Sequence, residues 1–318
     1  MKKTNIFPLI LAFVIIGGAA WFLSQNNAVK SSNTTITEQK VANVKINSGQ
    51  LIIATKTNLA NQIISFSNNG QNKIIFTDKT ESAKILKVGS TNVQTKNIPV
   101  IEGTGELALI ALDGTGKNQI LNQNFNAQDL SLSPSGEKIA SISFSNAEKD
   151  YGYSLNISDK TGQNTKTIFR SNKILSSPVW LDDKKLVFIK AQIDDKTTLA
   201  QIDIATGDQT DLYSVGINEN LYDLNFSNEK LLISLGTTDA SSSSLYQLDP
   251  TGKNPKKLYT EDSGIIYNPT FSSDKNQIAY LVNDMVSDDP YGAIYIINSN
   301  GANKQKISTG SKIISWLP

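Results

Sequence analysis

The chain has 318 residues, with 30 Lys and Arg against 29 Asp and Glu, a net charge of +1, and it contains no His and no Cys. Without His, imidazole acid–base catalysis and His-ligated metals are excluded, and without Cys, disulfides, zinc–thiolate sites and iron–sulfur clusters are excluded. The near-neutral charge and a single arginine, Arg170, argue against a nucleic-acid partner.

A predicted membrane segment opens the chain. Residues 6–23 (IFPLILAFVIIGGAAWFL) are apolar and follow Lys2 and Lys3. As a helix they would extend roughly 27 Å, close to the thickness of a hydrocarbon core, and the two lysines favour a cytoplasmic N-terminus. The small residues at 18–20 are an alternative signal-peptide cleavage site, but the apolar run continues past them. Residues 1–23 are therefore predicted to anchor the chain in the cell membrane by a single pass, with the remainder on the extracytoplasmic side.

A polar spacer is predicted to follow at residues 24–40 (SQNNAVKSSNTTITEQK). This stretch has few apolar side chains, so it cannot bury enough surface to offset the entropy cost of ordering. We expect it to act as a flexible link between the membrane and a folded domain at 41–318.

Residues 41–318 show short apolar runs separated by Ser, Asn, Asp, Gly and Pro, which is an all-β pattern. Two elements recur in it. The first is an anchor strand, a polar turn with Lys and a second strand, at 64–76, 130–140, 179–189, 224–234 and 269–281. The second is a pair of strands around a Gly-containing turn, at 107–121, 153–169, 199–213, 244–259 and 293–308. Each unit thus has four antiparallel strands, which is the repeat of a β-propeller blade.

The spacing of the anchor residues supports a ring. The anchors are Phe66, Leu132, Trp180, Phe226, Phe271 and Trp316, and from Leu132 onward they lie 48, 46, 45 and 45 residues apart. Residues 312–318 begin another unit but stop before its partner strands, which the strands around 46–57 would supply. We therefore expect the C-terminal strand to close the ring on the N-terminal strands. The count is six blades, or seven if residues 83–103 form a blade of their own.

These motifs resemble the TolB-like propeller repeat, which is related to the WD-type family. Ser133-Pro134-Ser135-Gly136-Glu137-Lys138 is similar to the family's first turn, and Ile294-Tyr295-Ile296-Ile297-Asn298 with Gly301 is similar to its second hairpin. The resemblance covers about 60–318 and implies a propeller fold, but the turns at 180–183 and 226–229 lack the family's Pro and Gly. Because this chain has a membrane segment where TolB has a separate domain, the resemblance does not imply a particular partner.

Paired carboxylates are the first candidates for chemistry. Asp182-Asp183, Asp194-Asp195 and Asp288-Asp289 are the adjacent acidic pairs considered for glycoside hydrolysis. Each lies in a predicted turn or loop, where Asp is common because it caps backbone amides. Acidic residues are expected in turns rather than on the anchor strands that line a propeller channel, so no catalytic residue is predicted.

Two loops are candidates for binding. Asp284, Asp288 and Asp289 could offer oxygen ligands to Ca²⁺, although their spacing is not that of an EF-hand. Tyr151 and Tyr291 occupy equivalent loops, where tyrosine suits a binding surface or packs at the blade rim.

The sequence therefore predicts an exported, membrane-anchored, non-catalytic β-propeller that binds a protein, a peptide or an envelope glycan through its loops. The alternative is a carboxylate-dependent glycoside hydrolase or lyase that uses the propeller channel. Two acidic side chains converging in that channel would favour the alternative.

Overall fold

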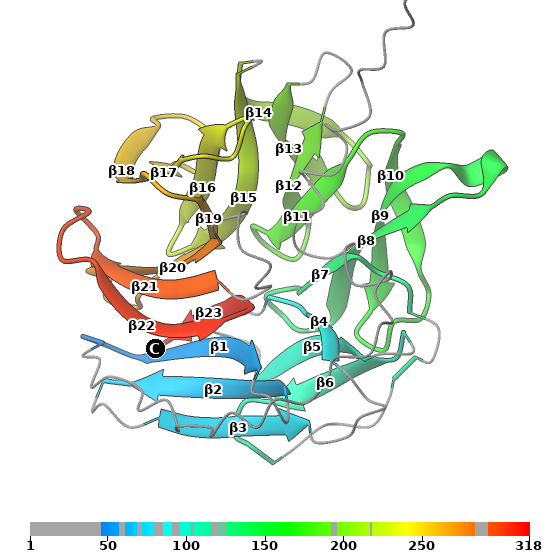
Figure 1. The fold of residues 1–318 in the computed structure, drawn as a ribbon. Helices are drawn as coiled ribbons and strands as arrows, with labels where there is room; N and C mark the ends of the chain where they lie inside the picture. The colour runs from blue at the N-terminus through cyan, green and yellow to red at the C-terminus, as the bar shows by residue number, and fades with distance from the viewer. Residues whose placement is uncertain are drawn as a thin grey trace, which may run out of the picture.

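The computed structural model describes residues 46–56, 61–68, 72–78, 85–90, 96–102, 105–115, 121–122, 125–191, 196–216, 218–283 and 292–318. In these ranges the chain folds into antiparallel β-sheets arranged around a common centre (Figure 1). The prediction of an all-β propeller with four-stranded antiparallel blades is confirmed.

Four consecutive blades follow the predicted repeat. Their strands, from the centre outward, are β7 (Asp129–Leu132), β8 (Lys138–Ser145), β9 (Gly152–Asp159) and β10 (Lys166–Ser171); β11 (Leu175–Trp180), β12 (Lys185–Ala191), β13 (Thr197–Asp203) and β14 (Gln209–Ser214); β15 (Glu219–Ser227), β16 (Lys230–Thr237), β17 (Ser243–Leu248) and β18 (Lys256–Glu261); and β19 (Ile265–Phe271), β20 (Gln277–Asn283), β21 (Gly292–Asn298) and β22 (Gln305–Gly310). A short 3-10 helix, η3 (Glu148–Asp150), precedes β9.

The fifth four-stranded blade, called the closing blade, joins the two ends of the described chain. It contains β23 (Lys312–Leu317), β1 (Gln50–Lys56), β2 (Asn61–Ser67) and β3 (Asn72–Asp78), in that order. Strands β1 and β23 are antiparallel and place Leu51 opposite Trp316. The indole nitrogen of Trp316 donates a hydrogen bond of 2.8 Å to the carbonyl of Ser48. The C-terminal strand therefore pairs with the N-terminal strands, as the truncated last unit indicates.

The blade count needs a correction, because the structure has five four-stranded blades rather than six. The remaining place in the ring holds a three-stranded sheet of β4 (Ile85–Val88), β5 (Asn97–Glu102) and β6 (Leu107–Ala111). Its fourth-strand position shows, in the described residues, only an isolated bridge between Leu107 and Asn122. Residues 83–103 do not form a separate blade, since they supply two strands of this sheet.

The misassigned segment is 64–76, which was predicted to begin a blade with Phe66 as its anchor. It instead forms the outer two strands of the closing blade, β2 and β3. The reason is that ring closure uses β23 as the inner strand, so three N-terminal strands, and not one or two, complete that blade. The next sheet is left with β4, β5 and β6.

The core lies between neighbouring sheets. Hydrophobic clusters join each sheet to the next around the whole ring. One cluster packs Ile142 and Leu155 of the β7–β10 blade against Trp180 and Phe188 of the next blade. The indole nitrogen of Trp180 also donates to the carbonyl of Ser131 at 3.2 Å. Trp180 and Trp316, two of the predicted anchors, are both buried between sheets.

The predicted anchor at 1–23 and spacer at 24–40 lie outside the described residues. Within the part of the chain that the structure describes, no helix has the length and hydrophobicity needed to cross a membrane.

Candidate functional site

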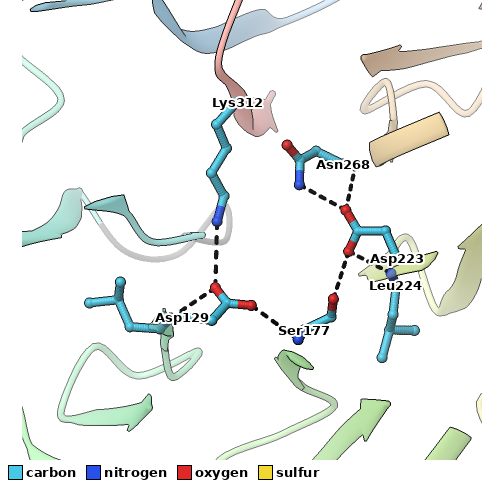
Figure 2. Close-up of polar contacts among 7 residues, drawn as sticks. Asp129, Ser177, Asp223, Leu224, Asn268 and Lys312 are labelled. Carbon is cyan, nitrogen blue, oxygen red and sulfur yellow. Dashed lines mark hydrogen bonds and ion pairs between the residues drawn. The ribbon is translucent and has the colours of Figure 1, made fainter. Parts of the chain in front are cut away.

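A cluster of polar side chains lies where the inner strands meet. It consists of Asp129 of β7, Ser177 of β11, Asp223 of β15, Asn268 of β19 and Lys312 of β23, and is called the axial cluster. Figure 2 shows these side chains pointing toward one another from five different sheets. The first four lie three residues before the anchors Leu132, Trp180, Phe226 and Phe271, so they occupy the same position in successive repeats.

Local irregularity of the inner strands creates this geometry. Strands β11, β15 and β19 each shift register against their second strand near the cluster, between Ser176 and Val179, Leu221 and Asp223, and Tyr267 and Thr270. Ser177 and Asn268 adopt left-handed backbone conformations, with φ of 52° and 48°. An extra residue in a strand re-aims the neighbouring groups, and here the backbone amides of Ser177 and Asn268 point at carboxylates of other blades.

Asp223 is the most heavily bonded member of the cluster. One carboxylate oxygen accepts hydrogen bonds from the Ser177 hydroxyl at 2.8 Å and from the Leu224 amide at 2.7 Å. The other accepts from the backbone amide of Asn268 at 2.7 Å and from its side-chain nitrogen at 2.9 Å. The residue is only 6% exposed. Burial raises the pKa of the Asp223 carboxyl, an effect that the hydrogen bonds oppose and that the charge of Asp129 reinforces.

Asp129 has a similar but more open arrangement. Its carboxylate accepts from the amide of Leu130 at 2.9 Å and from the amide of Ser177 at 3.0 Å. The ammonium group of Lys312 lies 3.7 Å from the Oδ1 atom of Asp129, and the two side chains are 31% (Asp129) and 21% (Lys312) exposed. This ion pair connects β7 to β23, whose blades are separated in the ring by the three-stranded sheet.

The cluster has two chemically different parts. The two carboxylate oxygens of Asp223 accept hydrogen bonds from four donors, which connect the inner strands β11, β15 and β19. Asp129 and Lys312 form a long ion pair whose side chains are partly exposed. No group of three acidic side chains suited to holding a metal ion occurs among the described residues.

The loop residues predicted as binding residues fall largely outside the described ranges. Asp284, Asp288, Asp289 and Tyr291 all do, and with them the calcium loop. Tyr151 is described, and it is 62% exposed directly after η3. Its ring contacts Phe144 edge-on at a centroid distance of 5.6 Å. Tyr151 does not belong to the axial cluster.

The acidic pair Asp182-Asp183 shows the predicted turn behaviour. Asp182 accepts from the amides of Lys184 and Lys185 at 2.7 Å and 2.8 Å. Asp183 accepts from the amide of Ser135 in the neighbouring blade at 3.0 Å. Both carboxylates therefore organise turns.

The expectation that acidic residues avoid the anchor strands is wrong for Asp129 and Asp223. Both lie on inner strands and contact a shared residue, Ser177. The spacing that identified the anchors also identifies this position, since moving three residues upstream in each repeat reaches the cluster.

Comparison with solved structures identifies proteins of similar fold. No family model and no curated protein matched the chain. Among solved structures, a putative TolB from Agrobacterium tumefaciens has 12% identity and a TM-score of 0.62, covering 84% of this chain and 94% of that one. TolB from Acinetobacter baumannii has 14% identity and a TM-score of 0.63, covering 84% and 67%. An oligogalacturonate lyase in complex with manganese has 12% identity and a TM-score of 0.55, covering 78% and 70%. At such low sequence identities, the similarity is evidence for the fold alone. The chain is thus a β-propeller similar in architecture to those of TolB proteins.

Proposed function

We propose that this chain is an exported, membrane-anchored β-propeller that binds a protein, peptide or envelope-glycan partner without catalysing a reaction. The axial cluster is the surface through which we expect the partner to bind. The proposal adds the axial cluster to the predicted loop residues, most of which lie outside the described ranges.

The bonding state of Asp223 is the observation that carries the non-catalytic part of the proposal. A general base needs a free lone pair within reach of a substrate proton. Asp223 instead receives four hydrogen bonds from the protein itself while almost completely buried. Such a carboxylate supports the shape of the site, and the open ion pair beside it offers one charge of each sign to a partner.

The membrane anchor and the export of the propeller rest on the sequence. The apolar run at 6–23, the preceding lysines and the polar stretch at 24–40 support a single-pass protein of the cell membrane with the propeller on the extracytoplasmic side.

Charge removal at the open ion pair tests the binding proposal. The full chain in detergent is immobilised and its retention of envelope proteins and glycans is compared with that of Lys312→Gln and Asp129→Asn variants. We expect about tenfold weaker retention of a specific component, because a charge-assisted hydrogen bond is worth roughly 1.5–3 kcal/mol. Lys253→Gln, at an exposed turn outside the cluster, is the matched control and should bind as the wild type does.

Unchanged retention by both cluster variants would contradict the proposed binding surface. Thermal unfolding of each variant must accompany the comparison, so that weaker retention caused by misfolding is recognised. A folded variant that loses the same component identifies the cluster as its binding site.

The second candidate function is a carboxylate-dependent glycoside hydrolase or lyase. The observation that favours it is the approach of Asp129 and Asp223 to the same Ser177, together with the raised pKa of Asp223, since such enzymes use two carboxyl groups in different protonation states. The similar fold of the oligogalacturonate lyase makes oligogalacturonate the first substrate to test. Product release by the wild type that disappears in an Asp223→Asn variant shown by circular dichroism to remain folded at the assay temperature would establish this function in place of the first.

A further inference from the structure

The two faces of the propeller differ in what they carry. Asp129 and Lys312 are the first residues of their inner strands β7 and β23, whereas Ser177, Asp223 and Asn268 lie inside β11, β15 and β19. The face where the inner strands begin, on which the Asp129–Lys312 end of the axial cluster lies, is called the axial face. The inner strands end at the opposite face, where turns such as 133–137 and 272–276 lead to the second strand of each blade. That side is called the turn face.

The described chain enters the propeller on the turn face. Gln50, the first residue of β1, pairs with Leu317, the last residue of β23. Immediately before it, the amide of Asn47 donates to the side-chain oxygen of Gln277 at 2.8 Å, and the hydroxyls of Ser48 and Ser273 lie 3.2 Å apart. Ser273 belongs to the turn 272–276 on that face, and Gln277 is the first residue after this turn.

This entry is held firmly by packing. Ile46 is 1% exposed and belongs to the hydrophobic cluster between the β19–β22 blade and the closing blade. Gly49 has φ of 72°, and a Cβ atom there would lie 2.0 Å from the carbonyl oxygen of Leu317. Only glycine fits so close to the neighbouring backbone. The attachment point of everything that precedes Ile46 is therefore fixed to the turn face.

We infer that the turn face is held toward the membrane and the axial face is presented away from it. This inference rests on the anchor in the proposed function. Residues 24–45, a total of 22, separate the predicted membrane segment from Ile46. The predicted spacer, 24–40, supplies 17 of these residues. A flexible chain of all 22 has a root-mean-square span of roughly 26 Å, against about 75 Å when fully extended. Turning the axial face to the bilayer would require this tether to pass around the side of the propeller, which costs conformational entropy.

The orientation specifies the kind of partner. A component that binds Asp129 and Lys312 from the axial face approaches from the aqueous compartment or from structures beyond it. A protein embedded in the same bilayer beside the anchor would meet the turn face or the outer strands instead.

Single-cysteine labelling tests the orientation, because the natural chain has no Cys. Ser311→Cys places a label on the axial face and Ser135→Cys places one on the turn face, and both serines are exposed. Each full-length variant is reconstituted into liposomes, labelled with a membrane-impermeant donor dye and measured for energy transfer to acceptor-labelled lipid headgroups. We expect higher transfer from the Ser135→Cys variant than from the Ser311→Cys variant.

A second pair guards against local disturbance by the label. Lys253→Cys on the turn face and Thr238→Cys near the axial face should show the same order, and both residues are exposed. Equal or reversed transfer in liposome-bound protein overturns the orientation and leaves the anchor intact. Protein that fails to float with the liposomes overturns the anchor and, with it, this inference.

Discussion

At the scale of single residues, aspartates in the hairpin turns organise the backbone of each blade. Asp249 accepts hydrogen bonds from the Thr251 hydroxyl at 2.6 Å and from the amides of Thr251 and Lys253 at 3.0 Å and 2.9 Å. Its second oxygen accepts from the side chain of Asn254 at 2.9 Å. These bonds, led by the Thr251 hydroxyl, lower the pKa of Asp249 to about 2. Asp159 makes the equivalent set of bonds in another blade.

This turn predicts a defined dependence of stability on pH. The folded pKa of Asp249 lies below its unfolded value of 3.8, so its contribution is present above the unfolded value and is lost as the pH falls toward the folded value. We expect the difference in melting temperature between the wild type and Asp249→Ala to be largest above about pH 4 and to shrink between about pH 4 and pH 2. Thermal unfolding followed by circular dichroism measures this difference.

The same experiment on Asp159→Ala should show the same trend, because its turn has the same bonds. Lys253→Gln keeps the Asp249 carboxylate and serves as the control, with a difference that does not change over this pH range. A difference for Asp249→Ala that is equally constant would show that the turn bonds do not favour the ionised carboxylate.

At the scale of the strand, the inner strands combine a packing role with a polar one. The inner strands β7, β11, β15, β19 and β23 each end at an anchor or one residue after it. The anchors of β11 and β23, Trp180 and Trp316, are buried between sheets. Three residues before the anchor, a bulge in β11, β15 and β19 lets a polar group bond across blades. Asp223 is the centre of this arrangement, since its partners come from the strands on either side of β15.

Replacement of Asp223 by Asn should destabilise the fold. An amide offers one acceptor oxygen where the carboxylate offers two, so two of the four donors lose their partner in a buried site. We expect a loss of about 1–3 kcal/mol for each donor left unpaired, measured by urea unfolding. Asp129→Asn is the matched control and should cost less, because Asp129 is partly exposed and water is able to replace its bonds. An equal loss in the two variants would contradict the supporting role assigned to Asp223.

At the scale of the whole molecule, closure of the ring depends on the pairing of β1 with β23. The two strands are separated by almost the entire propeller in sequence, and hydrophobic clusters on both sides of the closing blade complete the core. Without this pairing the inner edge of β1 would be left with unpaired backbone groups.

A disulfide across the closing blade should stabilise the ring. Gln50 and Leu317 are direct partners in the pairing of β1 with β23, and neither is buried. The double variant Gln50→Cys/Leu317→Cys should unfold at a higher temperature when oxidised, with a gain of up to about 4–5 kcal/mol expected for so long a loop. The gain should disappear on reduction and be absent in Gln50→Cys alone. Failure of the two cysteines to form a bond would contradict the observed register.

Much of the propeller was predictable because its signals are local. The turn residues and the alternating apolar runs are properties of short segments, and the regular interval between Leu132, Trp180, Phe226 and Phe271 shows that these segments repeat along the chain. They identify four blades directly, and the truncated unit that ends with Trp316 indicates ring closure. Phe66 was misplaced because a hairpin of β2 and β3 has the same local pattern whether it begins a blade or ends one.

The axial cluster was missed for a related reason. A bulge breaks the alternation of inward and outward side chains, so the period of two does not mark Asp223 as pointing toward the centre. Its partners Ser177 and Asn268 lie more than forty residues away in the chain. Their proximity exists only once the sheets have been arranged around one centre.

The sequence by itself determined the strand-rich architecture, the repeat, the anchor positions from Leu132 onward and the use of the last strand to close the ring, because hydrophobic periodicity and turn chemistry act over a few residues. The tertiary structure alone decided that the closing blade takes β2 and β3, that a three-stranded sheet follows it, and that five polar residues meet on the axis. Those outcomes depend on which distant strands become neighbours, and that choice is made by burial and hydrogen bonding over the whole ring.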